Sequence, residues 1–149
     1  MNVKFRGKSV VDEAWLYGDL VHSADGSWTG ILVSDKSTYE ECEVYPGTVC
    51  VSTGIQDING SDIYSDDIIS ICLYCGKVKT AEGVFTDLRK RGIGIVFYDA
   101  ELARWRVRQK NIVVNLVNKK EAKSISFKVL GNIHDNPEYS RRYPGEQTL

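Results

Sequence analysis

Residues 52–69 read Ser52-Thr53-Gly54-Ile55-Gln56-Asp57-Ile58-Asn59-Gly60-Ser61-Asp62-Ile63-Tyr64-Ser65-Asp66-Asp67-Ile68-Ile69 and contain the strongest turn signal of the chain. The pair Asn59-Gly60 accepts the positive φ angles that a tight type I′ turn requires. We therefore predict a hairpin that joins a strand over residues 53–57 to a strand over residues 62–64. This central segment indicates antiparallel β-structure.

Short strand-like runs flank the hairpin, separated by turn signals such as Asp25-Gly26, Pro46-Gly47 and Arg91-Gly92. The runs cover residues 14–17, 30–33, 48–52, 68–74, 93–98, 103–109, 112–117 and 126–130. So many short, punctuated strands are typical of a barrel or a sandwich. We predict an all-β fold, a single-domain, partly open β-barrel or sandwich of short antiparallel strands with little helix. Helical turns are expected only in residues 99–104 and after Asn136-Pro137.

The length of 149 residues favours one domain, and 42% hydrophobic with 26% charged residues is the composition of an ordinary globular chain. We predict one domain over residues 1–140 and a frayed tail over residues 141–149, which contain Pro144 and Gly145. No apolar stretch follows the basic start of the chain, and no segment approaches the roughly 18 apolar residues of a membrane span. We expect a cytoplasmic protein that does not enter the membrane.

The four cysteines, Cys42, Cys50, Cys72 and Cys75, are expected to be thiols in a reducing compartment. Cys72 and Cys75 have the CxxC spacing of a zinc knuckle, yet the sequence around them predicts a strand that ends in a turn. Residues three apart on a strand point to opposite faces, which does not suit shared metal ligation. We therefore expect no metal or cofactor. A four-cysteine zinc site is the alternative if Cys75 lies in the turn.

The net charge of −1 hides a strong asymmetry along the chain. Residues 12–67 contain twelve acidic side chains and one basic one, whereas residues 77–128 contain thirteen basic and five acidic ones. If the two halves stay apart in space, the protein has an acidic and a basic side, which favours self-association or an anionic partner. If their strands interleave, the charges neutralise one another.

No catalytic motif is recognisable, so we predict a protein that is not an enzyme. The two histidines, His22 and His134, show no metal-ligand spacing and adjoin no nucleophile motif. We expect His134 to buttress a turn near the end of the chain. We expect Asp57, Asp62 and Asp67 to bond the backbone N–H groups of their turns. The alternative is a metal or catalytic carboxylate cluster that also includes Asp66, although the spacing of the four residues does not fit a calcium loop.

The candidate binding residues lie in the basic half. In the run Arg104-Trp105-Arg106-Val107-Arg108-Gln109-Lys110, a strand would place four cations on one face and direct Trp105 and Val107 into the core. Together with a predicted loop at Arg89-Lys90-Arg91, they would grip phosphates through guanidinium hydrogen bonds. The candidate anion-binding residues are Arg89, Lys90, Arg91, Arg104, Arg106, Arg108 and Lys110. The competing interpretation is a solvated face whose charges pair with acidic side chains of the protein itself.

Several blocks resemble the YopX family of phage and prophage proteins. They are residues 4–8, Lys4-Phe5-Arg6-Gly7-Lys8; residues 15–18, Trp15-Leu16-Tyr17-Gly18; the central residues 52–69; and residues 129–138, from Val129-Leu130-Gly131-Asn132 to Glu138. The resemblance implies a β-rich single domain encoded by phages or prophages, and it implies no particular activity.

Three classes of function remain open from the sequence. The first is a non-enzymatic phage accessory protein that binds a host factor or an anionic, nucleotide-type small molecule in a basic pocket, as in counter-defence. The second is a nucleic-acid-binding regulator that uses the same arginines. The third is a structural or assembly component of the phage particle. We expect a homo-oligomer in each case, because the bipolar charge and open strand edges favour pairing.

Overall fold

The structure, a computed structural model, describes residues 2–35 and 37–142 and confirms the all-β prediction. The strands are β1 (Phe5–Lys8), β2 (Trp15–His22), β3 (Thr29–Asp35), β4 (Thr38–Glu43), β5 (Cys50–Gln56), β6 (Asp62–Tyr64), β7 (Asp67–Lys79), β8 (Phe85–Asp99), β9 (Arg104–Arg108), β10 (Val113–Asn115) and β11 (Ile125–Asn132). A 3₁₀ turn, η1 (Pro46–Thr48), and one short helix, α1 (Glu138–Arg142), complete the described elements.

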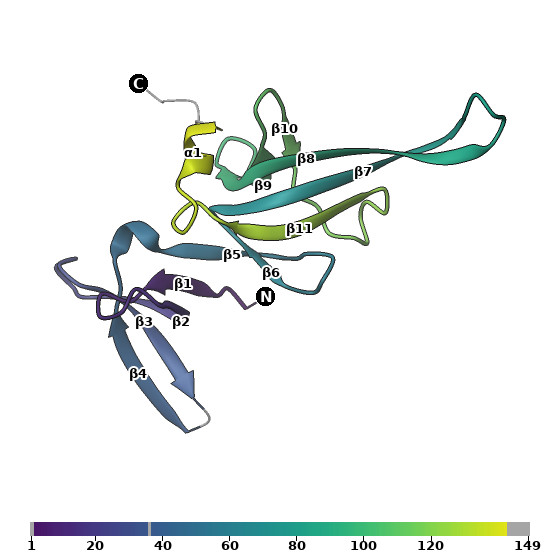
Figure 1. Cartoon of the computed structure of the whole chain (residues 1–149). Helices are drawn as coiled ribbons and strands as arrows, with labels where there is room; N and C mark the ends of the chain where they lie inside the picture. Colours follow the sequence, from purple (N-terminus) through teal and green to yellow (C-terminus); the bar gives the residue numbers. More distant parts are fainter. Residues whose placement is uncertain (1, 36, 143–149) are drawn as a thin grey trace. The chain divides into compact units, whose positions relative to one another are not determined.

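The strands form two antiparallel sheets (Figure 1). One sheet has the order β4-β3-β2-β1-β5-β6 and the other has the order β10-β9-β8-β7-β11, and they do not form a closed barrel. The chain packs as two compact units, residues 1–54 and residues 55–149, and β5 runs from the first unit into the second. The prediction of a single domain over residues 1–140 stays a prediction.

The first unit is organised around β1, which pairs with β2 on one side and β5 on the other. Arg6 of β1 is buried, and its guanidinium carbon lies 4.7 Å from the centroid of the Trp15 ring, so the cation is covered by an aromatic face. Gly18 of β2 permits close approach of β3, since a Cβ atom there would lie 2.0 Å from the carbonyl oxygen of Leu32. The sheet therefore requires glycine at this position.

The predicted turn at Asp25-Gly26 is confirmed between β2 and β3. Gly26 has a φ of 73°, and the carboxylate of Asp25 accepts hydrogen bonds from the Ser27 backbone N–H (3.0 Å) and from the Ser27 and Ser23 hydroxyls (2.7 and 2.8 Å). The Ser27 hydroxyl is the main cause, with the other two donors, of a pKa for Asp25 lowered to about 2.

The core of the second unit lies on one face of the β10-β9-β8-β7-β11 sheet. Its buried members include Ile69 and Ile71 of β7, Val96 of β8, Val107 of β9 and Phe127 of β11. The predicted alternation in β9 is confirmed, since Val107 is fully buried and Trp105 packs against the core. Burial of these apolar side chains drives the folding of this unit.

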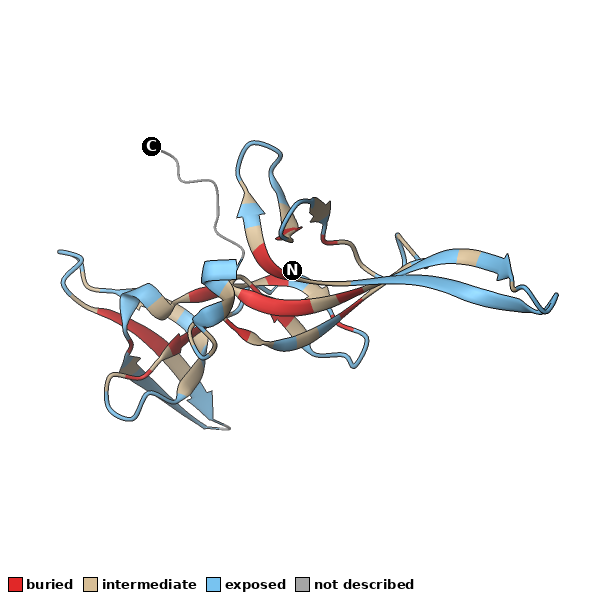
Figure 2. Cartoon of the chain, turned by 45° about the horizontal axis from the view of Figure 1, so that its top comes forward, coloured by how far each residue is buried: buried red, intermediate tan, exposed pale blue. Residues whose placement is uncertain are grey.

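The β7–β8 hairpin is much longer than the sequence predicts. Residues 89–91 were expected in a loop, but they lie in β8, paired with Tyr74, Leu73 and Cys72 of β7. The prediction was wrong because backbone pairing with β7 outweighs the low strand propensity of three consecutive cations. The distal residues of the hairpin are almost all exposed (Figure 2).

The predicted hairpin over residues 53–64 is confirmed, but the prediction of a type I′ turn within it is wrong. Gly60 has a φ of 80°, whereas Asn59 does not have a positive φ. The Gly60 N–H donates to the Asp57 carbonyl (3.0 Å), and the Asp57 N–H donates to the Ser61 carbonyl (2.8 Å). This is the three-residue loop in which a type I turn is followed by a bulge at glycine.

The side chain of Asp57 explains the longer loop. Its Oδ1 accepts hydrogen bonds from the backbone N–H groups of Asn59 and Ser61 (both 2.9 Å), and its Oδ2 accepts one from the N–H of Val129 in β11 (3.0 Å). In the next turn, Oδ2 of the buried Asp67 accepts from the N–H of Tyr64 (2.8 Å). Both side chains bond the turns as predicted, and Asp57 also ties its turn to β11.

The end of the described chain is partly as predicted. α1 lies after Pro137 and ends at Arg142, so Arg141 and Arg142 of the predicted tail are helical, while residues 143–149 lie outside the described residues. Residues 100–103 form turns rather than helix. No helix among residues 2–35 and 37–142 is long and apolar enough to cross a membrane.

Replacing Asp57 with alanine is expected to lower the free energy of unfolding by about 3 kcal/mol, because three backbone donors lose a charged acceptor. Urea denaturation followed by tryptophan fluorescence measures this loss. Asp19→Ala is the control, since Asp19 is exposed in β2, and it should change stability by less than about 0.5 kcal/mol. Equal losses in the two variants would contradict the proposed role of Asp57.

Candidate anion-binding face

The cations of β9 lie on the side of the sheet opposite the core. Because Val107 and Trp105 face the core, the alternating Arg104, Arg106 and Arg108 face outward. Lys110, the fourth predicted member of this stripe, follows the end of β9 and is exposed in the turn to β10. The sequence-predicted stripe is therefore confirmed for three of its four residues.

Strand pairing extends this face onto β8 and β11. Directly paired residues share a face, and the pairs Arg108–Ile95 and Arg106–Phe97 place the odd-numbered residues of β8 beside the β9 arginines. We define the basic face by Arg89, Arg91, Arg104, Arg106, Arg108 and Lys128. Lys128 of β11 pairs with Ser70 of β7, and Ser70 pairs with Ile93 of β8. Ile93 is one of the odd-numbered residues of β8, so Lys128 lies on the same side of the sheet as the arginines. Lys90 belongs to the opposite side of the sheet.

Lys128 was missed by the sequence analysis, although a signal was present. Phe127 and Val129 both contribute to the core side of the sheet, so period-two alternation directs the residue between them outward. By the same alternation, Lys90 points to the opposite side of the sheet from Arg89 and Arg91.

Two arginines of the basic face lie over aromatic rings. The Arg108 guanidinium carbon is 5.0 Å from the centroid of Phe97, and that of Arg89 is 5.6 Å from the centroid of Tyr74. Arg89 also lies 3.8 Å from an Asp87 carboxylate oxygen. Stacking on a ring restrains the orientation of a guanidinium group.

Arg106 is held by groups of the protein itself. Its Nη1 donates to Oδ2 of Asp99 (3.0 Å), and its Nε donates to Oδ1 of Asn115 (3.2 Å). The hydrogen bond from Arg106 is the main cause of a lowered pKa for the Asp99 carboxyl, and the N–H groups of Leu102 and Glu101 lower it further. Arg106 therefore agrees with the competing interpretation, in which an acidic side chain of the chain neutralises the cation.

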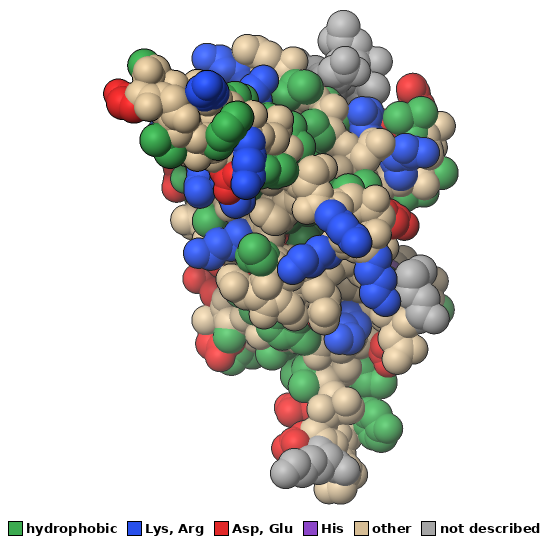
Figure 3. Space-filling model, turned by 90° about the vertical axis from the view of Figure 1, so that its right-hand side faces the viewer, with side chains coloured by type: hydrophobic (Ala, Val, Ile, Leu, Met, Phe, Trp, Pro, Cys, Tyr) green, Lys and Arg blue, Asp and Glu red, His purple; other side chains and the backbone are tan. Residues whose placement is uncertain are grey.

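The basic and acidic halves of the sequence form different sheets. Residues 1–54 carry eight acidic and four basic side chains, whereas residues 55–149 carry twelve acidic and fifteen basic ones. Figure 3, seen from the side toward which the β7–β8 hairpin extends, shows many Lys and Arg side chains and fewer Asp and Glu side chains. The charge asymmetry of the sequence is thus retained within the two units.

Two cavities lie away from the basic face. They have volumes of about 80 and 30 Å³, and neither is lined by a cation of the basic face. The larger one lies between Ile68, Leu130 and Tyr139 and their neighbours. The basic pocket expected from the sequence stays a prediction.

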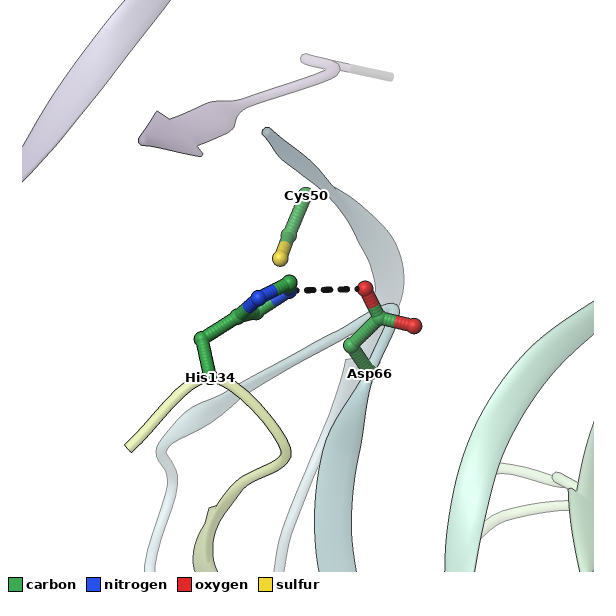
Figure 4. A group of neighbouring side chains, drawn as sticks. All are labelled: Cys50, Asp66 and His134. Atoms are coloured by element: carbon green, nitrogen blue, oxygen red, sulfur yellow. Dashed lines mark hydrogen bonds and ion pairs between the residues drawn. The ribbon is translucent and has the colours of Figure 1, made fainter. Parts of the chain in front are cut away.

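A separate polar contact joins Asp66 and His134 (Figure 4). Nε2 of His134 lies 2.9 Å from Oδ2 of Asp66, a residue with a φ of 66° in the turn between β6 and β7. The backbone supports the same junction, since the Ile133 N–H donates to the Asp66 carbonyl (3.0 Å). The side chain of His134 therefore contacts the turn between β6 and β7, whereas the sequence predicted a role in the turn near the end of the chain. The contact connects the β6–β7 turn to the segment after β11.

The four central carboxylates are bound in separate places. Asp57 and Asp67 bond backbone N–H groups, Asp66 contacts His134, and Asp62 accepts a hydrogen bond from Gln56 (3.3 Å). These contacts favour the architectural interpretation over a shared carboxylate site.

A family model described as YopX protein matches residues 4–139, which include the basic face, the central hairpin and the Asp66–His134 contact. The chain belongs to the YopX family. Among solved structures, it is similar to the "Crystal structure of protein EF1440 from Enterococcus faecalis", with 20% sequence identity, a TM-score of 0.52, and coverage of 93% of this chain and 97% of that chain. This likeness shows a shared fold. No curated protein matches the sequence.

The cysteines of this YopX-family protein are free thiols. Cys75 lies at an irregularity of β7 between Tyr74 and Gly76, and β7 then continues to Lys79, so the turn that would favour a zinc knuckle is not formed there. Cys72 is paired with Arg91. Burial, with a contribution from the Glu40 carboxylate, raises the pKa of the Cys42 thiol.

In this YopX-family protein, Arg106→Gln is expected to raise the pKa of Asp99 toward the ordinary aspartate value, because the main donor to the carboxylate is lost. In the native protein the contact between Arg106 and Asp99 stabilises the fold at pH values above the ordinary aspartate pKa. This contribution is lost as the pH falls through the lowered pKa of Asp99. Carboxyl ¹³C NMR titration measures both states. Asp25 is the internal control, since Ser23 and Ser27 keep its pKa at about 2 in both proteins. An Asp99 titration that does not move in the variant would refute the assignment.

Proposed function

We propose that this YopX-family protein is a non-enzymatic accessory protein that binds an anionic ligand on its basic face. The observation that carries the proposal is the alternation that places Arg104, Arg106 and Arg108 of β9 on one side of a sheet, with Arg91 and Arg89 on the same side farther along β8. Successive outward residues of a strand lie about 6.7 Å apart, so neighbouring guanidinium groups of β9 reach one multiply charged ligand.

Phosphate groups suit this face best. Guanidinium groups bind phosphate oxygens through paired, charge-assisted hydrogen bonds, and Arg108 and Arg89 are already restrained by Phe97 and Tyr74. The resemblance to phage and prophage proteins gives the biological setting. There, a cytoplasmic protein that binds a host factor or a nucleotide-type signal would protect the phage from host defence.

A nucleic-acid-binding regulator is the second candidate, and the spread of the basic face along β8 and β9 favours it. A single strand needs an extended basic surface with aromatic rings rather than a closed pocket. Tyr74 is 37% exposed next to Arg89, so it is available for stacking with a base.

Arg91→Gln combined with Arg108→Gln tests the proposal. The matched control is Lys90→Gln combined with Lys110→Gln, which removes the same charge from residues outside the basic face. The probes are ATP, a cyclic dinucleotide and a single-stranded DNA of about 20 nucleotides, measured by calorimetry. We expect the first variant to bind at least one probe about 10-fold or more weakly than the native protein, because two charge-assisted contacts are lost. The control should retain its affinity within about 2-fold.

Salt dependence separates the two candidates. Each phosphate contact to a single strand contributes roughly 0.7 to the slope of log affinity against log salt, so DNA binding is steeply salt-dependent. Nucleotide binding is much less so. If none of the three probes binds, or if both double variants lose affinity equally, the basic face is not the site.

A further inference from the structure

The edge of β8 is open over the distal part of the β7–β8 hairpin (Figure 1). The pairing of β9 with β8 begins only at Ile95, so no strand within residues 2–35 and 37–142 borders residues 85–91 on that side. All of residues 85–91 are exposed. The free backbone N–H and C=O groups of such an edge are a template for pairing with another strand.

The side chains of this open edge also suit a further strand. Phe85 and Leu88 are 66% and 40% exposed, and Leu88 has a charge of opposite sign on each side, Asp87 and Arg89. Asp87 and Arg89 lie 3.8 Å apart with side chains 45% and 50% exposed, so this long contact leaves both groups accessible. Because a two-stranded ribbon is at best marginally stable alone in water, a third strand would stabilise this part of the hairpin.

Two-fold symmetry determines how an edge strand pairs with its own copy. A two-fold axis perpendicular to the sheet makes the two strands antiparallel and keeps equivalent sides of the two sheets together. The axis passes through one residue, which meets its own copy. Residues at equal distances before and after that residue pair with each other, so each choice of central residue brings a definite set of charges opposite one another.

We propose that two copies of this chain associate through residues 85–91 of β8, with Leu88 on the two-fold axis. Asp87 then pairs with Arg89 of the second copy, and Phe85 pairs with Arg91 of the second copy. Both contacts occur twice. Opposite charges that are directly paired attract, a guanidinium group is attracted to an aromatic ring, and the two Leu88 side chains cover each other.

The charges select this register and this edge. An axis through Asp87 or Arg89 would place two like charges opposite each other, whereas the register centred on Leu88 opposes none over residues 85–91. The corresponding edge of β7 is unsuitable, because an axis through Val78 would pair Lys77 with Lys79 of the second copy. Within its own hairpin Asp87 pairs with Lys77, so its carboxylate would lie between two cations.

The association lies within one strand of the second unit and goes beyond the proposed function. Because the axis is perpendicular to the sheet, the basic faces of the two copies would lie on the same side of one continuous sheet. Dimerisation itself needs no anion, and Thr86, Leu88 and Lys90 do not belong to the basic face. Cross-linking at these positions therefore reports on the association separately from anion binding.

Disulfide cross-linking tests the register. Directly paired residues have Cα atoms about 4.5–5.5 Å apart, within the range of a disulfide, so Leu88→Cys should link the two copies across the axis. Thr86→Cys is the matched control on the same side of the same strand, because it would lie roughly 13 Å from its own copy. All variants carry Cys75→Ser, since Cys75 is exposed.

We expect Leu88→Cys to give about 10-fold more covalent dimer than Thr86→Cys on non-reducing electrophoresis after oxidation with glutathione disulfide. A mixture of Thr86→Cys with Lys90→Cys should cross-link as efficiently as Leu88→Cys, because these two positions pair in the proposed register. Equal cross-linking of Leu88→Cys and Thr86→Cys would contradict it.

A charge exchange tests the pairing of Asp87 with Arg89. Asp87→Arg and Arg89→Asp each place like charges opposite one another twice, so each should raise the dissociation constant of the dimer by about 10-fold or more. A mixture of the two variants restores attraction at both contacts and should form a heterodimer of nearly native affinity. Glu82→Arg is the control, because it makes the same charge change in the exposed turn of the same hairpin, outside residues 85–91.

Sedimentation velocity over a range of concentrations measures these constants, and circular dichroism verifies that each variant is folded. A native protein that remains monomeric at about 100 μM would overturn the proposal, since an association that weak would not be specific. So would native affinity in both single variants, or a mixture that fails to reassociate.

Discussion

The antiparallel pairing of β7 with β8 is the constraint on which the second unit depends. Its register decides which residues face the core, since a shift by one residue would exchange the two faces of every strand. Gly92 and Gly94 of β8 allow β9 to approach closely on the core side. A Cβ atom on Gly94 would lie 2.6 Å from Cγ1 of Val107, and one on Gly92 would lie 3.0 Å from Oε1 of Gln109. Only glycine lets β9 approach this closely.

The same register creates the basic face. When Val96 and Val107 pair on the core side, the flanking cations must share the outer side, because side chains alternate along both strands. The arginines are therefore brought together by the packing of their apolar neighbours. No attraction between them is required, and their mutual repulsion opposes the arrangement. The carboxylate of Asp99 offsets part of this repulsion at Arg106.

The sequence predicted the face of each β9 residue because alternation is a local property, written in Arg104-Trp105-Arg106-Val107-Arg108. It failed where partners distant in sequence decide the structure. Residues 89–91 are basic and adjoin Gly92, a local pattern typical of a loop, but β7 supplies the hydrogen-bonding edge. β4 was missed for a similar reason, since its three glutamates disfavour a strand until β3 pairs with it.

The loop of the central hairpin shows a subtler limit. Asn59-Gly60 is compatible with a type I′ turn, and nothing local excludes it. The carboxylate of Asp57 changes the outcome, because it bonds the N–H groups of Asn59 and Ser61 and also that of Val129. The last of these donors is 72 residues away in the sequence, so its contribution was not readable from the segment itself. The turn type is thus set by the docking of β11.

Repulsion within the basic face explains why an anion would stabilise the fold as well as bind to it. The cations of the basic face are paired with residues other than cations, so the relevant spacing is that of successive outward residues along a strand, about 6.7 Å. This spacing is shorter than the Debye length of about 8 Å at physiological ionic strength, so dissolved salt does not fully screen neighbouring arginines of β9 from one another. A ligand with several negative charges removes this repulsion at many pairs at once, whereas one carboxylate, such as Asp99, relieves only its nearest neighbour. A multivalent anion is therefore the class of ligand that the proposed function predicts for the basic face.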